Sequence, residues 1–592
     1  MGELQREWHP VCSLRRAEVE RYRTQVLSQF YAQPSTAERV LRLGIISDSD
    51  QAPRFYAEVL KSVLGSHRAT IELVVKLDGG PRPAGGGLLF ERYRRWDDAR
   101  IRREDDPFAP CDLSPLLNKA ARVTARAEPG GTLDGASASM IRGYQLDVLL
   151  LLSPCELTGE AADLARHGLW QYQFGDGDTY SGAPAHLWEV IDRHPLSGVT
   201  LCRLSGEAGR RKVLERALFD SRSGDNISWA RNRERPAWAA TWFVTRQMHR
   251  IAEGENGAAP RTEQAPAGRG MPGNLRTAAW LGGKLVSSVR RRFEPKRMDH
   301  WKMALRTGGG PLLREPEGPN FQGFRWIDSP PGHFYADPFL CQRDGRTWLF
   351  YEHYRYPLEI ADLDVAEVLP DGSLGESHRV LRRPYHLSFP QVFEHDGEMY
   401  MLPETGGNRT VELYRATRFP YEWTLDRVLL EGHHAVDTAV WKGEDRWWFF
   451  STLKDPRGGC GFLVLFSASH LHGEWSYHPA NPICSDVRAA RGAGAIFRQD
   501  GRLLRPSQDC SVRYGYRLNF HEITRLNPKE YEERTLRTIH PEELGGGFNG
   551  IHTYNRVGSF EVIDGCLPES SSVAVPAGGD SDARSRDTEW SR

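Results

Sequence analysis

The sequence has no long apolar run and no closely paired cysteines. Its longest apolar stretch, residues 146–152, is interrupted by Asp147 and is far shorter than the about 20 residues that a membrane-spanning helix needs. The nine cysteines are scattered without a C-x-x-C pair, which argues against a disulfide framework or a structural zinc site. The opening residues MGELQREWHP lack the apolar segment of a secretory signal. We therefore expect a cytoplasmic protein with reduced thiols.

The sequence also lacks an excess of charge of either sign. Lys and Arg number 77 against 78 Asp and Glu, for a formal net charge of −1. No basic field exists to attract a polyanion, so we predict no nucleic-acid partner. The chain of 592 residues is too long for one compact domain, and 39% apolar residues with 10% aromatics can fill several cores.

The N-terminal part predicts a short charged leader, residues 1–40, followed by an α/β domain over residues 41–250. Strands that alternate with helices form an open, mostly parallel sheet, and buried parallel strands are apolar on both faces. Apolar runs predict strands at 42–47, 71–77 and 146–152, and helical spacing of apolar residues predicts a helix at 52–64.

A change of composition predicts a linker with a basic helix over residues 251–318. Residues 253–274 are rich in Gly, Ala, Pro and Glu, as flexible linkers are. The stretch 280–297 that follows combines apolar residues with Arg290, Arg291, Arg292, Lys296 and Arg297. One interpretation is a solvated connector. The other is a peripheral contact with anionic lipid at the inner membrane face.

Five repeated hairpins predict a five-bladed β-propeller over residues 319–566. Each repeat has an aromatic-rich strand, a polar turn and a second apolar strand, and Asp-Gly between such strands is a strong hairpin signal. A β-sandwich is the alternative fold. The Ser/Gly/Asp-rich tail, residues 567–592, predicts disorder. The turns fall at Asp344-Gly345, Asp396-Gly397, residues 443–445, Asp500-Gly501 and Val557-Gly558.

The α/β domain resembles the catalytic core of the formyltransferase family. The resemblance rests on GLWQYQFGDGDTYSG at residues 168–182 and on SGVT at 197–200, and it implies a formyltransferase-like open sheet. The Asn, His and Asp of the family fall on Gln171, Gln173 and Gly209. Neither Gln nor Gly can shuttle a proton as the reaction requires. We therefore expect a degenerate domain without formyltransferase activity.

The candidate site is the central funnel of the propeller. The innermost strand of each blade lines this funnel, so polar residues that open such strands converge although they lie far apart in sequence. An acid at such a position can instead cap a turn. No metal site is predicted. The catalytic candidates are Asp337, Glu404, Asp437 and Asp509, and the substrate-binding candidates are His333, His386, Arg505, Gln508 and His552.

The propeller segment resembles two families. YADPF at residues 335–339 resembles the first-blade aspartate motif of the five-bladed family-43 glycosidases. The runs HLSFPQVFEHDGEMYMLPET, LYRATRFP, HPANPI, RPSQDCS and GIHT resemble the N-terminal propeller of the plant glucosamine inositolphosphorylceramide transferase family and its bacterial relatives. This resemblance implies biosynthetic sugar chemistry on a carbohydrate or lipid-linked substrate. In the plant family a separate domain is assigned the transfer, so whether the propeller is catalytic stays open.

Three functions follow as hypotheses. The first is a glycosyltransferase or glycan-assembly enzyme for surface polysaccharide or glycolipid, with a nucleotide-sugar donor and Asp337 or Glu404 as base. Arg505 and His552 would then neutralise a phosphate leaving group. The second is a family-43-type glycoside hydrolase with Asp337 as base and Glu404 as acid. The third is a non-catalytic glycan-binding scaffold. The sugar and the oligomeric state stay open.

Overall fold

The computed structural model describes two compact units. The first comprises described residues within 40–217 and 228–278, and the second those within 218–221, 279–454 and 461–570. The predicted leader lies outside the described residues except for Val40. The described residues are 40–78, 85–101, 105–128, 130–155, 157–181, 184–221, 228–254, 262–266, 268–293, 297–308, 310–314, 318–454 and 461–570.

The first unit is built on a mixed, largely parallel sheet in the order β10-β9-β8-β7-β6-β1-β3-β5. Strands β5, β3, β1, β6 and β7 are parallel, and β7 runs antiparallel to β8. The α/β prediction is confirmed, because β1, β3 and β6 fall on the three predicted strands. The bounds are β1 (Leu41–Ser47), β3 (Ala69–Asp78), β5 (Ala121–Arg126), β6 (Val148–Leu151), β7 (Leu169–Phe174), β8 (Leu196–Leu204), β9 (Arg210–Asp220) and β10 (Thr262–Gln264). A small separate sheet pairs β2 (Gln51–Pro53) with β4 (Pro110–Asp112).

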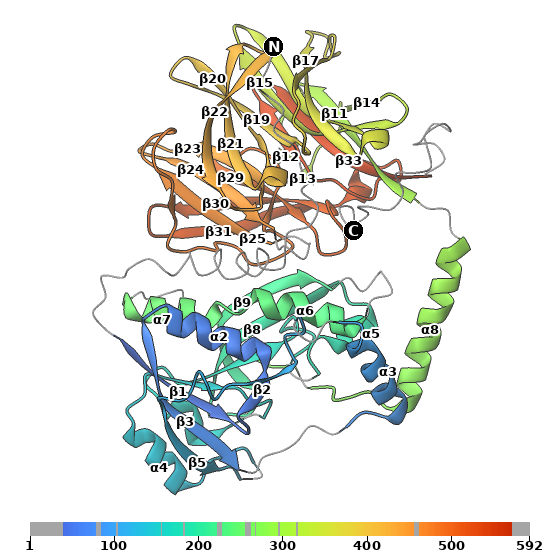
Figure 1. Cartoon of the computed structure of the whole chain (residues 1–592). Coiled ribbons are helices and arrows are strands. Elements are labelled where there is room, and N and C mark those ends of the chain that lie inside the picture. The colour runs from blue at the N-terminus through green and yellow to red at the C-terminus, as the bar shows by residue number, and fades with distance from the viewer. Residues whose placement is uncertain are drawn as a thin grey trace, which may run out of the picture. The chain divides into compact units, whose positions relative to one another are not determined.

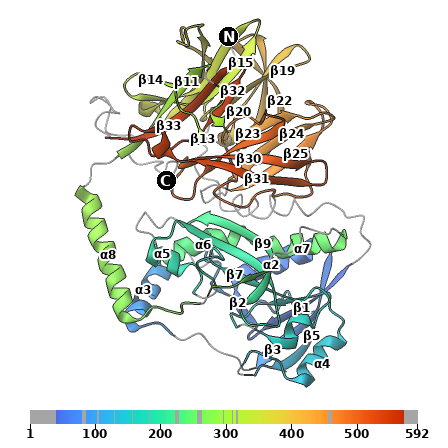
Figure 2. The same cartoon turned by 180° about the vertical axis from the view of Figure 1, so that it is seen from behind.

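Helices cover both faces of this sheet (Figures 1 and 2). Helices α2 (Arg54–Gly65) and α7 (Phe243–Ala252) lie on one face, and α4 (Gly135–Gly143) lies on the other. The predicted helix at 52–64 is confirmed, because α2 buries the four apolar residues that predicted it, Phe55, Val59, Leu60 and Val63. The remaining helices are α3 (Leu88–Asp98), α5 (Leu187–Asp192), α6 (Trp229–Ala239) and α8 (Asn274–Phe293).

The second unit is a five-bladed β-propeller, as predicted. Each of the first four blades is a sheet of consecutive strands, and the fifth is assembled from β14, β11, β33 and β32. The bounds of blade one are β15 (His333–Arg343), β16 (Arg346–Arg355), β17 (Ile360–Val368) and β18 (His378–Leu381); of blade two, β19 (Ser388–His395), β20 (Glu398–Glu404), β21 (Thr410–Arg418) and β22 (Glu422–Glu431); of blade three, β23 (Ala435–Lys442), β24 (Trp447–Leu453), β25 (Phe462–Ala468) and β26 (Ser476–Tyr477). Those of blade four are β27 (Arg491–Gly492), β28 (Phe497–Gln499), β29 (Arg502–Asp509), β30 (Arg517–Leu526) and β31 (Tyr531–Ile539); of blade five, β11 (Arg297–Thr307), β14 (Arg325–Ile327), β32 (Tyr554–Val557) and β33 (Phe560–Ser570).

The turn chemistry explains why the hairpins repeat. Asp344, Asp396 and Asp500 have φ of 53°, 51° and 50°, and the glycine after each also has positive φ. A two-residue turn of this kind needs positive φ at both positions, which Asp and Gly tolerate well. The three Asp-Gly turns therefore fix the strand pairing of blades one, two and four.

The prediction of a linker over 251–318 is wrong where strands form. At the end of this range β12 (Leu313–Arg314) pairs with β13 (Gly318–Pro319), and two further strands pair over longer distances. Strand β10 pairs with β9 at the edge of the first sheet, and β11 pairs with β33 along its whole length, from Arg297 opposite Ser570 to Thr307 opposite Phe560. The prediction of disorder from 567 is likewise wrong for residues 567–570, which belong to β33. Residues 571–592 lie outside the described residues. The errors at β10, β11 and β33 arise because these strands pair with partners distant in sequence.

Among the described residues, none of the helices combines the length and apolarity needed to cross a bilayer.

Candidate functional site: the axial cluster of the propeller

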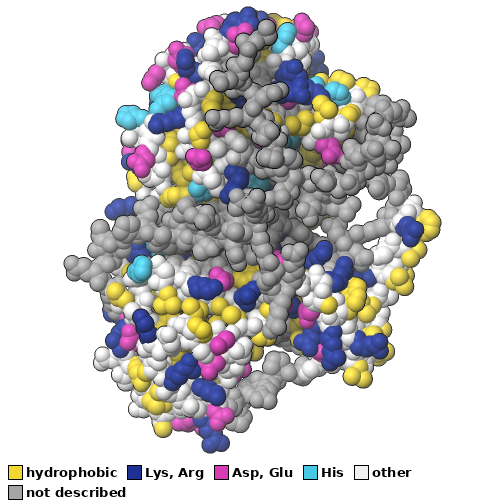
Figure 3. All heavy atoms as spheres, in the orientation of Figure 1, with side chains coloured by type: hydrophobic (Ala, Val, Ile, Leu, Met, Phe, Trp, Pro, Cys, Tyr) yellow, Lys and Arg dark blue, Asp and Glu magenta, His cyan; other side chains and the backbone are white. Residues whose placement is uncertain are grey.

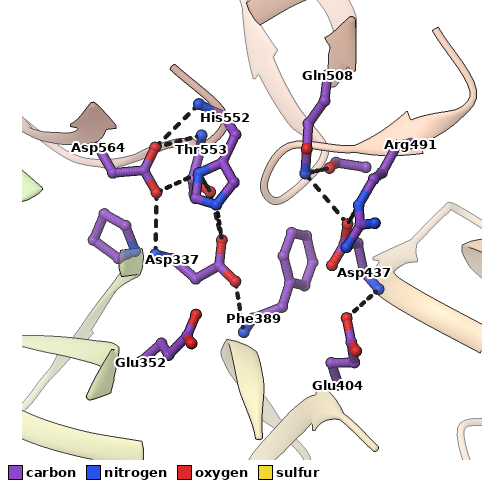
Figure 4. A network of polar contacts seen from close by, with 12 residues as sticks. Asp337, Glu352, Phe389, Glu404, Asp437, Arg491, Gln508, His552, Thr553 and Asp564 are labelled. Atoms are coloured by element: carbon purple, nitrogen blue, oxygen red, sulfur yellow. Dashed lines mark hydrogen bonds and ion pairs between the residues drawn. The ribbon is translucent and has the colours of Figure 1, made fainter. Parts of the chain in front are cut away.

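Three innermost strands are deformed at equivalent positions. In β15, β19 and β23 the pairing register shifts at a β-bulge, between Ala336 and Phe339, between Ser388 and Gln391, and between Val436 and Ala439. Within these bulges Asp337, Phe389 and Asp437 have φ of 46°, 50° and 46°. Such values are uncommon for residues other than glycine, and bulges re-aim side chains next to functional sites. The bulges present two aspartates, Asp337 and Asp437, in one polar network (Figure 4).

Asp337 is held by groups from three blades. Its Oδ1 accepts the Thr553 hydroxyl at 2.6 Å, and its Oδ2 accepts the Phe389 backbone N–H at 3.2 Å. Its own backbone N–H donates to Asp564 Oδ2 at 3.1 Å. The side chain is almost fully buried, with 3% exposed. Blades one, two and five therefore meet at this carboxylate.

His552, just before β32, is clamped between a carboxylate and an indole. Its Nδ1 lies 2.6 Å from Asp564 Oδ2, and its Nε2 lies 3.8 Å from Asp337 Oδ1. The ring stacks on Trp301 of β11, with centroids 3.7 Å apart and planes at 14°. Asp564 also accepts the backbone N–H groups of His552 and Thr553. These contacts fix the imidazole beside Asp337.

Asp437 is the centre of a second group of contacts. Arg491 Nε donates to Asp437 Oδ2 at 2.5 Å, and Gln508 Nε2 donates to the same oxygen at 3.3 Å. The Asp437 backbone N–H donates to Glu404 Oε2 at 3.4 Å. Gly492 allows this packing, because a Cβ there would lie 2.7 Å from the Asp437 carbonyl oxygen. Asp437 therefore links a fixed guanidinium to Glu404.

Two glutamates occupy equivalent places on second strands. Glu352 of β16 pairs in register with Ala336, and Glu404 of β20 pairs with Ser388, in each case just before the bulge. The half-buried His386 places its Nε2 3.2 Å from Glu352 Oε1. Burial alone would lower the pKa of His386, but the neighbouring Glu352 raises it above its ordinary value. Glu352 therefore favours the protonated form of this imidazole.

Burial and mutual repulsion perturb the protonation of the cluster. Burial, with Glu352, Asp437 and Asp564 nearby, raises the pKa of Asp337 to about 7 against the opposing effect of His552. Burial and Glu404 raise the pKa of Asp437 to about 7 although Arg491 opposes the shift. Burial would lower the pKa of His552, but Asp564 and Asp337 raise it to about 9. At neutral pH the cluster thus pairs an imidazolium with a carboxyl group that readily gains or loses a proton.

The structure brings together five of the nine predicted residues, namely Asp337, Glu404, Asp437, Gln508 and His552, and His386 adjoins them through Glu352. Three lie elsewhere. Arg505 forms a two-pronged ion pair with Glu533 of β31, at 2.7 and 2.8 Å, and is therefore not available to a phosphate as predicted. Asp509 accepts the Ser511 backbone N–H at 2.9 Å and lies 3.8 Å from Arg517 of β30. His333 contacts His353 at 2.7 Å instead.

Several members of the cluster were not predicted from the sequence. In blade four the predicted residues lie on β29, whereas the innermost strand is the short β27, which supplies Arg491. The signal for Glu352 was present, because FYE at 350–352 repeats LPE at 402–404. No sequence pattern marks Asp564 or Trp301, because both lie in strands of blade five in which polar and apolar residues do not alternate regularly. The missed residues are Trp301, Glu352, Arg491, Thr553 and Asp564.

One group of potential metal ligands occurs among the described residues. Asp337, His552 and Asp564 offer ligand atoms within 4.8 Å of one another. Backbone and hydroxyl donors reach the carboxylate oxygens of both aspartates, and Asp564 Oδ2 lies 2.6 Å from His552 Nδ1. These contacts hold the three side chains together.

In the first unit, the residues that replace the formyltransferase triad have structural contacts. The buried Gln171 amide donates to the carbonyls of Ser153 and Cys155 at 3.1 and 2.9 Å. Gln173 Oε1 accepts the Ser181 hydroxyl at 3.0 Å. Gly209 has φ of 73° and supplies no side chain. None of the three provides a group that titrates near neutral pH.

Comparison with known proteins supports the sugar-related resemblance of the propeller. Residues 327–557 match the family model described as glucosamine inositolphosphorylceramide transferase 1, N-terminal. Proteins of that name from Oryza sativa subsp. japonica and Arabidopsis thaliana are 33% and 35% identical over 243 and 233 residues. The matches cover 40% and 38% of this chain but 32% and 30% of those proteins. The chain thus spans about a third of the length of the curated relatives it matches.

Solved structures give weaker similarities. The GH62 α-L-arabinofuranosidase of Coprinopsis cinerea is 18% identical, with a TM-score of 0.32 over 48% of this chain and 94% of its own. The RS223 β-xylosidase is 10% identical, with a TM-score of 0.30 over 40% and 93%. Glycinamide ribonucleotide transformylase 1 of Symbiobacterium toebii is 14% identical, with a TM-score of 0.26 over 39% and 100%.

Proposed function

We propose that the propeller is a sugar-transferring enzyme of glycan or glycolipid assembly, with its active site at the axial cluster. The observation that carries this proposal is the buried Asp337, whose pKa is raised to about 7 and which lies 3.8 Å from the clamped His552. A general base works best when its pKa lies near the working pH. The match of residues 327–557 to a transferase family model supports a sugar substrate, with a lipid-linked acceptor as in the name of that family.

The reaction assigns a role to each part of the cluster. An acceptor hydroxyl attacks the anomeric carbon of a nucleotide-sugar donor, its proton passes to Asp337, and the bond from that carbon to the phosphate oxygen breaks. Glu404 stabilises the positive charge that develops on the sugar ring. His386, whose pKa is raised by the neighbouring Glu352, takes the place of Arg505 beside the departing phosphate. His552, held by Asp564, keeps Asp337 able to ionise despite its burial.

The compartment is also part of the proposal. The cysteines among the described residues are all free thiols, as is usual where thiols are kept reduced. We therefore place the reaction in the cytoplasm.

Glycoside hydrolysis is the second candidate, because the same two carboxyl groups would serve it. Asp337 would activate water and Glu404 would protonate the leaving oxygen. In that case the protein releases the chromophore from an aryl glycoside and does not consume a nucleotide sugar. A binding scaffold would do neither and would keep its glycan when both carboxyl groups are neutralised.

The test is donor turnover by the full chain, with a panel of nucleotide sugars and glycolipid acceptors, and aryl glycosides in parallel. Asp337→Asn and Glu404→Gln should each lower the transfer rate by at least a hundredfold, the lower end of general acid–base contributions. Asp344→Asn, in an exposed turn, is the matched control and should keep the rate. Unchanged turnover in Asp337→Asn, or no turnover with any donor, contradicts the proposal.

A further inference from the structure

Helix α8 exposes its apolar side instead of burying it. Five large apolar side chains are exposed and fall within about a third of the helix circumference at 100° per residue. On the opposite side Thr277 is fully buried, and Trp280 is only 9% exposed. An ordinary surface helix has the reverse arrangement. The exposed side chains are Leu275 (90%), Leu285 (67%), Val286 (68%), Val289 (52%) and Phe293 (81%).

The charge of α8 is of one sign only. Residues 274–293 contain Arg276, Lys284 and the run Arg290–Arg292 and no acidic residue. By helical spacing, Arg290 and Arg292 flank the apolar stripe. A basic, apolar helix without acids is typical of segments that lie in the interface of an anionic membrane.

The apolar and basic side chains of α8 lie along the same helix. Figure 3 shows yellow and dark-blue side chains together along α8. Exposed apolar side chains beside arginines on one helix are the composition of a membrane interface.

We propose that the exposed face of α8 is a docking surface for an anionic lipid bilayer. Single exposed apolar residues are common on proteins, but a continuous stripe of this kind marks an interaction site. The bilayer is favoured over a protein groove because the face combines apolar side chains with basic residues and no acids, which matches acyl chains beneath anionic headgroups. The helix lies in the headgroup region with the stripe towards the acyl chains.

Vesicle flotation with the full chain tests this surface. Vesicles of phosphatidylcholine mixed with phosphatidylglycerol are compared with phosphatidylcholine alone, at low and high salt. We expect binding to the anionic vesicles that weakens with salt, and loss of more than tenfold in Leu285→Glu with Phe293→Glu. Arg292→Gln should weaken binding about fivefold, the effect expected of one basic residue near an anionic surface.

The matched control is Leu425→Glu with Val428→Glu on β22, which changes exposed apolar residues (46% and 41%) at a different place. It should bind vesicles as the wild type does. Asp337→Asn should also bind normally, so that a failure of the funnel chemistry is distinguishable from a failure of docking. Equal binding to both vesicle types, or no binding to the anionic vesicles, overturns the proposal. A dimer that disappears in Leu285→Glu with Phe293→Glu, without vesicle binding, overturns it in favour of a second copy of the chain.

Discussion

Replacing Asp564 by Asn should uncouple His552 from its clamp. Asp564 Oδ2 lies 2.6 Å from His552 Nδ1, and both side chains are almost completely buried. The substitution keeps the size of the side chain and removes its charge. Burial then dominates, so the pKa of His552 should fall from about 9 to its ordinary value of 6.5 or below.

The magnitude follows from linkage. A pKa raised from 6.5 to about 9 corresponds to about 3 kcal/mol at 1.36 kcal/mol per pH unit. Between these two pH values the native state holds a proton that the unfolded state has lost, so the free energy of unfolding falls as pH rises. The wild type should have this stabilisation in full below pH 6.5 and lose it as pH rises through about 9. Asp564→Asn should lose most of this dependence.

The assay is a pH titration of ¹³C-labelled histidine by NMR, with the His552 resonance assigned by its absence in His552→Gln. Urea unfolding near pH 6.5 and pH 9 measures the linked stability. Asp344→Asn serves as the control, because its carboxylate is 89% exposed, and it should leave both measurements unchanged. A wild-type His552 that titrates at 6.5 or below, or an Asp564→Asn titration like that of the wild type, refutes the reasoning.

Three further substitutions test other parts of the propeller. Trp301→Leu removes the indole ring that stacks on His552, and cation–π contacts of this kind contribute about 2 kcal/mol when desolvated. The NMR titration should therefore show a lower pKa for His552. An unchanged pKa would contradict the stacking argument. Glu533→Gln leaves the buried Arg505 guanidinium of blade four without its counter-charge. Urea unfolding should then show a free energy of unfolding lower by about 3–5 kcal/mol. A decrease below 1 kcal/mol would show that the ion pair contributes little. Gly492→Ala places a Cβ 2.7 Å from a backbone oxygen and should lower the melting temperature by several degrees, which differential scanning calorimetry would detect.

The fold was largely predictable because its signals are local. Alternating apolar residues and Asp-Gly turns specify each hairpin within about a dozen residues, and Asp344 and Asp396 adopt the φ that those turns require. Strand β11 was missed because its partner β33 lies at the far end of the propeller segment. Pairing across such a separation leaves no mark in a local pattern.

The site was predictable only in part, for a related reason. Asp337 and Asp437 lie near the start of innermost strands, and His552 just precedes one, so the rule found all three. Arg491 lies on a two-residue strand that no hairpin pattern reveals. Asp564 lies within a largely apolar strand, where a buried carboxylate is unfavourable unless a group such as His552 pairs with it. Arg505 was misassigned because sequence alone does not show that Glu533 neutralises it.

The pairing of β11 with β33 joins the two ends of the propeller segment, with Arg297 opposite Ser570. Hydrogen bonds between β11 and β33 therefore close the ring of blades, and no covalent bond joins these two strands. A short peptide joining these positions, with new termini at the Asp396-Gly397 turn, would convert the hydrogen-bonded seam into covalent chain and leave every blade intact. Deleting β33 instead would remove one of the two middle strands of blade five, together with Asp564, the carboxylate that holds His552.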